Sequence, residues 1–358
     1  CTLIICSCSQ TETNKDTSNT SEEVKSNFNF QTETFADIKI LRYQVPGFEK
    51  LSLQQQKLVY YLSEAGYAGR DIIWDQNYRH NLSIRRTLEK IINEWDGNRN
   101  TSNWENFMTY TKRVWFSNGI HHHYSMDKFT PEFSEYYFTG LMNAVGASLN
   151  DEALKAMFDP TFDAKKVNLD PSKGLVLGSA VNFYDPDINE AEVDAYFASI
   201  KDSETNEPVS YGINSKLIRG KDGIEEKVYK LKGMYGEAIA EIIGWLEKAV
   251  SVAENQAQAD ALKLLVEYYK TGDLKTWDAY NIAWVDGPEM ADGLFHINEN
   301  TSGVRAGLFF LAGYKYGNSQ NITVLYKDNY STTFPISEIR IFSATLPNSG
   351  VSYTGACL

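Results

Sequence analysis

Residues 224–269 read IEEKVYKLKGMYGEAIAEIIGWLEKAVSVAENQAQADALKLLVEYY, and apolar residues recur in this stretch three and four positions apart. That spacing places side chains on one face of an α-helix. Two such faces occur. The first consists of Ile239, Ile242, Ile243, Leu246 and Val250, and the second consists of Leu262, Leu265 and Val266. The sequence therefore predicts that residues 224–269 are strongly helical and that Gly272 ends the second helix.

Similar apolar stripes occur towards the N-terminus. They predict helices over residues 51–64, from Leu82 to a stop at Gly97, and over 103–116 and 133–145, with a further short helix over 277–284. Thr130, Pro131 and Glu132 supply a cap, a first-turn proline and an acid, which predicts that the fourth of these helices starts there. Alternating apolar and polar residues over 37–45 predict a half-buried strand.

The remaining parts are mixed or rich in β-type residues. Between residues 165 and 220 we expect a strand at 174–177, a helix from Ala191 and an extended segment over 208–214. After Val285, short β-type runs lie between turn residues, at 307–311, 322–326 and 336–342. The fold class predicted from these patterns is α+β, mainly helical with a mixed α/β lobe, followed by a β-rich C-terminal tail.

The net charge limits the class of partner, and the positions of the cysteines limit the disulfides that could form. The 358 residues carry a formal net charge of −13 and a pI near 5.0, and no basic run interrupts this acidic average. Such a field repels polyphosphate, so nucleic acid is not expected as a partner. No disulfide framework spans the fold, because Cys1, Cys6 and Cys8 lie together and only Cys357 lies elsewhere.

The first residues are typical of a secretion signal. Ile5-Cys6-Ser7-Cys8 resembles a bacterial lipobox, so we expect residues 1–8 to be the remnant of a lipoprotein signal and Cys8 to be lipidated. Residues 9–33 are mostly polar and are expected to form a flexible tether. The expected location is the cell envelope, lipid-anchored to a bacterial membrane. An ordinary secretory signal or a chance apolar end would give the same composition.

Histidine is the side chain most relevant to metal chemistry, and the sequence has only five. None stands in an H-E-x-x-H or H-E-x-x-x-H arrangement, so the usual zinc-peptidase site is absent. On an extended backbone His121 and His123 would share a face and could bind a divalent metal with Asp127. Imidazoles also serve as hydrogen-bonding groups in a polar cleft or core. The residues expected to line a substrate cleft are Asn118, His121, His122, His123 and Tyr124.

Several unusual strings resemble bacterial dipeptidyl peptidase III. They are Gly69-Arg70-Asp71-Ile72, RVWFSNGIHHHYS at 113–125, PVSYGINSKL at 208–217, the helix from Val228 to Ala249, and TGDLKTW at 271–277. The resemblance covers residues 34–285 and does not extend to the tail, residues 286–358. It implies an N-terminal part of the family's fold, which has two lobes around a wide cleft.

The resemblance implies a zinc-dependent peptidase that releases dipeptides from the N-terminus of oligopeptides. The family holds zinc with the histidines of H-E-x-x-G-H and a later glutamate, and this sequence contains no H-E-x-x-G-H. We therefore expect a peptidase-type chain with oligopeptides as partners, no zinc bound and no hydrolysis. The alternative is a non-catalytic, lipid-anchored, peptide-binding protein whose anchor contacts the membrane.

Overall fold

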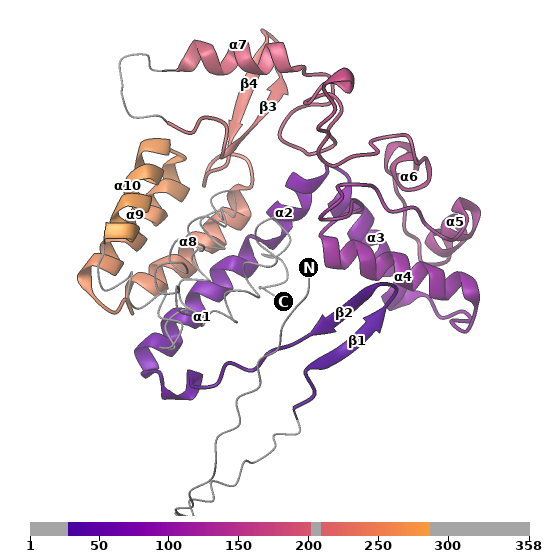
Figure 1. Ribbon diagram of the computed structural model, residues 1–358, viewed down its shortest axis with the longest axis horizontal. Helices are drawn as coiled ribbons and strands as arrows, with labels where there is room; N and C mark the ends of the chain where they lie inside the picture. The colour runs from indigo at the N-terminus through magenta and orange to yellow at the C-terminus, as the bar shows by residue number, and fades with distance from the viewer. Residues whose placement is uncertain (1–27, 202–208, 287–358) are drawn as a thin grey trace, which may run out of the picture. The chain divides into compact units, whose positions relative to one another are not determined.

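The computed structural model describes residues 28–201 and 209–286 (Figure 1). Its elements confirm the predicted class, α+β and mainly helical. The predicted lipoprotein signal at residues 1–8, most of the predicted tether and the predicted β-rich tail lie outside these described residues. Within them, every helix is too short or too polar to cross a lipid bilayer.

The N-terminal unit contains an antiparallel hairpin. Strand β1 covers Gln31–Phe35 and β2 covers Ile38–Leu41, with Phe35 paired to Ile38 and Gln31 to Leu41. The predicted strand at 37–45 is thus confirmed over Ile38–Leu41, and β1 begins inside the segment assigned to the tether. Ala36, at φ 48°, supplies the left-handed turn residue between the strands.

One hydrophobic cluster joins four helices of the second unit. They are α1 (Leu53–Ala68), α8 (Gly236–Val250), α9 (Gln256–Thr271) and α10 (Leu274–Asp286), and α1 is preceded by the 3-10 helix η1 (Phe48–Lys50). Helix α1 packs on α8, α8 on α9 and α9 on α10 (Figure 1). The predicted apolar faces supply this core, which includes Leu58, Leu62, Ile239, Ile242, Leu246, Leu262 and Leu265. Gly272, at φ 73°, ends α9 as predicted.

A second hydrophobic cluster joins five further helices. They are α2 (Arg70–Asn77), α3 (Asn81–Glu94), α4 (Ser102–Ser117), α5 (Glu135–Ala144) and α6 (Asp151–Phe158). Their core is aromatic, and Trp74, Phe107 and Phe138 are fully buried in it. The predicted start of α5 at Thr130–Glu132 is wrong, because Ser134 is the cap and accepts a hydrogen bond from the amide of Tyr137.

The mixed region corrects three predictions. It contains η2 (Pro171–Lys173), α7 (Glu190–Ile200) and an antiparallel hairpin of β3 (Ser215–Arg219) and β4 (Ile224–Val228), over which α7 lies (Figure 1). Residues 224–228 are therefore strand, not helix, and their burial alternates along the strand. Residues 174–177 form a turn, since Gly174 has φ 76° and its carbonyl accepts from the amide of Gly178. Residues 211–214 also turn, at Gly212 with φ 78°.

Candidate functional site

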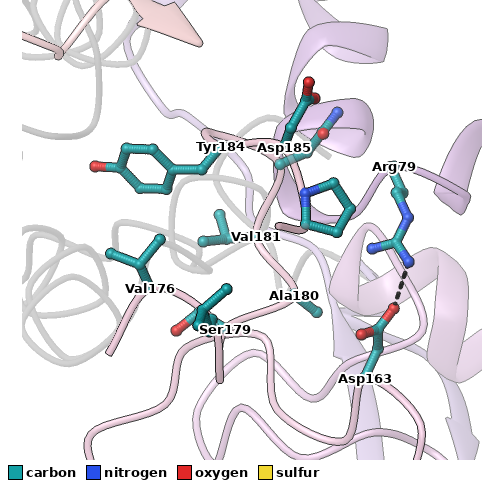
Figure 2. A pocket seen from close by; sticks show the side chains of 11 residues that line it. Arg79, Asp163, Val176, Ser179, Ala180, Val181, Tyr184 and Asp185 are labelled. Carbon is teal, nitrogen blue, oxygen red and sulfur yellow. Dashed lines mark ion pairs between the residues drawn. The ribbon is translucent and has the colours of Figure 1, made fainter. Parts of the chain in front are cut away.

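A shallow recess that is open to solvent lies where the second helical cluster meets the mixed region. Arg79, which follows α2, and Asp163 form one side, and residues 176–186 form the other (Figure 2). The ion pair between Arg79 and Asp163 faces this recess, with the two side chains joined at 2.9 Å. The recess therefore has a charged wall made by residues that lie far apart in the sequence.

Asp163 connects several side chains at this wall. Its Oδ2 accepts a 2.7 Å hydrogen bond from the hydroxyl of Tyr78 and also contacts Nη2 of Arg79. Its main-chain oxygen lies 2.8 Å from Nε2 of His121, which fixes that nitrogen as the donor. Burial, followed by the bond to Asp163, raises the pKa of the Tyr78 hydroxyl, so it stays protonated and donates.

Arg79 has a second carboxylate partner, Glu152 of α6, at 2.9 Å. The hydrogen bond from Arg79 lowers the pKa of the Glu152 carboxyl. Nε2 of His80 lies 3.3 Å from the other oxygen of Glu152. Burial lowers the pKa of His80, with a further contribution from the charge of Arg79, so the contact joins a neutral imidazole to a carboxylate at pH 7. Arg79 thus holds two carboxylates that would otherwise repel each other.

The opposite side of the recess is fixed to α2 and β3. The side-chain amide of Asn182 donates to Oδ2 of Asp75 at 3.0 Å, and the main-chain amide of Asn182 donates to the carbonyl of Gln76 at 2.9 Å. Lys216 of β3 donates to Oδ1 of Asn182 at 2.8 Å and pairs with Asp185 at 3.0 Å. The polar side chains on this side are therefore held by partners within the protein.

Three of the predicted cleft residues are buried. Asn118 ends α4 in the left-handed conformation, and its carbonyl accepts from the side-chain amide of Asn77 at 3.1 Å. His121 contacts Asp163 and packs edge-on against Tyr78. Nδ1 of His123 lies 3.1 Å from the hydroxyl of Ser117. The structure thus brings His121 to the charged wall and gives His123 a different set of partners.

The other two predicted cleft residues are accessible. His122 is half-buried and stacks on His123 with ring centres 4.5 Å apart, while its Nδ1 accepts from the main-chain amides of Tyr124 and Ser125. Tyr124 is exposed. Both side chains therefore reach the protein surface.

The metal hypothesis for His121, His123 and Asp127 gains no support. Asp127 pairs with Lys165 at 2.5 Å, and the two histidines have the separate partners described above. Among residues 28–201 and 209–286, no group of three histidine, cysteine or carboxylate side chains is placed to hold a metal ion. Burial also lowers the pKa of His121 to about 4, which makes it a neutral hydrogen-bonding group at pH 7.

The comparisons with known proteins agree with the resemblance in the sequence. Residues 188–291 match the family model of Peptidase family M49. The matched M49 region contains α7, the β3–β4 hairpin, α8, α9 and α10, and it confirms the resemblance to dipeptidyl peptidase III in that part of the chain. The recess and four of the histidines, His80, His121, His122 and His123, lie before the matched M49 region.

A solved structure of DPP III from Caldithrix abyssi is 18% identical in sequence, with a TM-score of 0.41. The alignment covers 67% of this chain and 34% of that chain, so this chain spans about a third of that protein. No curated protein sequence matches this chain.

Sequence reasoning found one member of the charged wall, His121, and missed Arg79, Glu152 and Asp163. Arg79 and Asp163 lie outside regular helices and strands, and Glu152 lies in α6, which the sequence did not predict. A carboxylate after a helix is usually solvated, so no local signal distinguishes Asp163 from other aspartates. Its role arises only when the fold brings it to Arg79 and Tyr78.

Proposed function

We propose that this chain is related to the metallopeptidases of the dipeptidyl peptidase III family. We propose further that it binds oligopeptides but does not cleave them. The observation that carries the proposal is the match of residues 188–291 to Peptidase family M49. Because H-E-x-x-G-H is absent from the 358 residues, they do not supply the two imidazoles and the general base that this motif provides for zinc catalysis.

We expect the accessible residues of the histidine segment, residues 118–125, to contact the peptide. Tyr124 offers an aromatic face and a hydroxyl, and half-buried His122 offers a stacked ring beside it. Such amphipathic groups suit the apolar and amide parts of a peptide. Asn118, His121 and His123 would support this surface from beneath, since each is buried with its partners inside the protein.

Hydrolysis is tested with a chromogenic dipeptidyl-arylamide and added zinc, using the full chain. We expect no release of the arylamine above a protein-free blank. Turnover that a chelator abolishes would contradict the proposal, because it would require a zinc site that we take to be missing.

Peptide binding is tested separately, by fluorescence anisotropy with a labelled octapeptide that has a free N-terminus. We expect saturable binding that weakens in Tyr124→Ala and His122→Ala. Tyr136→Ala is the matched control, because Tyr136 is an exposed tyrosine on α5 and we expect it to leave the affinity unchanged. Equal affinity in all four proteins would remove the histidine segment from the peptide site.

The second candidate is a non-catalytic, lipid-anchored, peptide-binding protein of the cell envelope, and the lipobox-like residues ending at Cys8 favour it. Acylation of Cys8 would place the chain at a bacterial membrane, with the polar residues after it as a spacer. Cells fed an alkynyl fatty acid should label the protein at Cys8, and Cys8→Ser should lose the label while Cys6→Ser keeps it. Labelling that persists in Cys8→Ser would rule out this anchor.

A further inference from the structure

One nitrogen of Arg79 makes both of its ion pairs. Nη2 contacts Oε1 of Glu152 and Oδ2 of Asp163, each at 2.9 Å. The same Oδ2 accepts the hydrogen bond from the Tyr78 hydroxyl. Within residues 28–201 and 209–286, no group forms a hydrogen bond with Nη1 or Nε of Arg79 or with Oδ1 of Asp163. The protein therefore leaves a donor and an acceptor side by side at the recess.

The groups around this donor and acceptor are held in place. Figure 2 shows Arg79 and Asp163 next to each other at the edge of the recess, with Ala180 and Val181 across from them. The main-chain oxygen of Asp163 is hydrogen-bonded within the protein, as is its Oδ2. The main-chain amides of Ala180 and Val181 donate to the carbonyls of residues 165–166, at 2.9 and 3.0 Å. A ligand that binds here therefore orders little of the protein.

The charges at this wall disfavour an ionic ligand. Arg79 lies between the carboxylates of Glu152 and Asp163, so the three side chains carry one net negative charge. An anion would be repelled by that charge and could not donate to Oδ1 of Asp163. An ammonium group would meet the guanidinium of Arg79. A neutral group that accepts from Arg79 and donates to Asp163 satisfies both atoms and introduces no unpaired charge.

The carboxamide group has both capacities, because its oxygen accepts hydrogen bonds and its nitrogen donates them. In a trans peptide unit the N–H and the C=O point in opposite directions, so one main-chain unit cannot reach two neighbouring protein atoms. A primary carboxamide has one N–H on the same side as its oxygen.

We propose that the recess binds a primary carboxamide, the group that ends the side chains of asparagine and glutamine. Its oxygen accepts from Arg79, its nitrogen donates to Oδ1 of Asp163, and the carbon atoms next to it pack on Ala180 and Val181. This site is separate from Tyr124 and does not depend on peptide binding there.

The experiment is saturation-transfer NMR of the full chain at pH 7 with four probes of similar size. Propionamide carries the primary carboxamide, propionate and N,N-dimethylpropionamide lack the N–H donor, and propylammonium lacks the acceptor. We expect the Kd of propionamide to be at least about fivefold lower than that of each other probe, because each of those leaves a protein atom without its partner. Absence of propionamide binding, or a Kd for propionate or propylammonium that is as low, overturns the proposal.

Val181→Phe places a ring in the recess opposite Arg79, because Val181 is half-buried and lines it. We expect this variant to lose propionamide binding. Val45→Phe is the matched control, since Val45 is 66% exposed and does not line the recess, and it should bind as the parent does. Unchanged binding in Val181→Phe overturns the proposal. Should that variant fail to fold, the four probes still decide, because they are measured on the unaltered chain.

The source of the carboxamide is distinguished with L-glutamine and N-acetyl-L-glutamine methylamide. At least one of them should bind about fivefold more tightly than the leucine compound of the same form. Tighter binding of the blocked compound assigns the group to a peptide, and only this outcome rests on the proposed function. Tighter binding of L-glutamine assigns it to the free amino acid. Equal binding of both glutamine compounds and their leucine counterparts overturns the proposal, whereas failure of octapeptide binding at Tyr124 would leave the propionamide result unchanged.

Discussion

The hydroxyl of Tyr235 donates a 2.6 Å hydrogen bond to Oδ2 of Asp75, 160 residues earlier in the chain. Tyr235 caps the start of α8 in the left-handed conformation, at φ 62°, and Asp75 lies on α2. The same carboxylate oxygen accepts from Asn182, which belongs to the wall of the recess. One carboxylate thus fixes both the start of α8, inside the M49 match, and a wall of the recess before it.

Removing this hydroxyl should destabilise the protein. Tyr235→Phe keeps the ring but removes the donor, and hydrogen bonds to charged groups contribute about 1.5–3 kcal/mol. We expect the free energy of unfolding, measured with urea, to fall by about that amount. Tyr136→Phe is the control, because its exposed side chain should leave the value unchanged. Equal stability of both variants would show that Asp75 is satisfied without Tyr235.

The charged wall should be more sensitive to substitution than an exposed ion pair. Asp163→Ala would leave the Tyr78 hydroxyl without its acceptor and Arg79 with Glu152 alone, so we expect a loss of about 2–3 kcal/mol in the free energy of unfolding. Asp260→Ala is the comparison, since it removes the exposed i,i+3 pair with Lys263 and should have no measurable effect. Similar losses in the two variants would contradict the role given to Asp163.

The amphipathic helices could be predicted from the sequence because each buries one regular stripe. Leu58 and Leu62 of α1, and Ile239 and Leu246 of α8, recur at helical spacing and all face the same core. Residues 224–228 were misassigned because glutamate and lysine favour helices, whereas pairing with β3 decides the local structure. That pairing depends on Gly220 and Gly223, whose turn returns the chain alongside β3.

The site was less predictable than the helices because it consists of long-range polar contacts. Tyr78 and Asp163 are 85 positions apart, and no periodic pattern relates them. The histidine segment stood out by its composition, yet burial decides what each ring can do. His121 and His123 point to different partners because the chain from Asn118 to Ser125 turns instead of running extended.

Stability should decrease with acid, and His121 should account for part of the decrease. Its pKa is about 4 in the folded protein and about 6.5 when unfolded, so the unfolded state binds the proton first as the pH falls. The contribution of neutral His121 is complete above pH 6.5 and is lost towards pH 4. Between pH 7 and pH 5 this lowers the free energy of unfolding by about 2 kcal/mol.

The pH dependence is measured by urea unfolding at pH 7 and pH 5, with His121→Gln beside the parent. The variant should be less stable at pH 7 but should lose less stability on going to pH 5. Part of the dependence should remain, because burial lowers the pKa of His80 in the same direction. An identical loss in parent and variant would show that His121 does not titrate in this range.

Two glycine-to-alanine substitutions should have opposite effects on stability. Gly119 has φ 150°, and a Cβ there would overlap the side-chain amide of Asn81, which is buried and donates to the carbonyl of Trp74. Gly119→Ala should therefore cost about 3 kcal/mol or more, from backbone strain and a displaced Asn81. Gly140 lies exposed within α5 with open space around it, so Gly140→Ala should stabilise by about 0.5–1 kcal/mol. Urea unfolding of both variants tests the pair. Oδ1 of Asn81 accepts a 3.1 Å hydrogen bond from the main-chain amide of Ile120, so tolerance of alanine at Gly119 would mean that this bond does not hold the histidine segment.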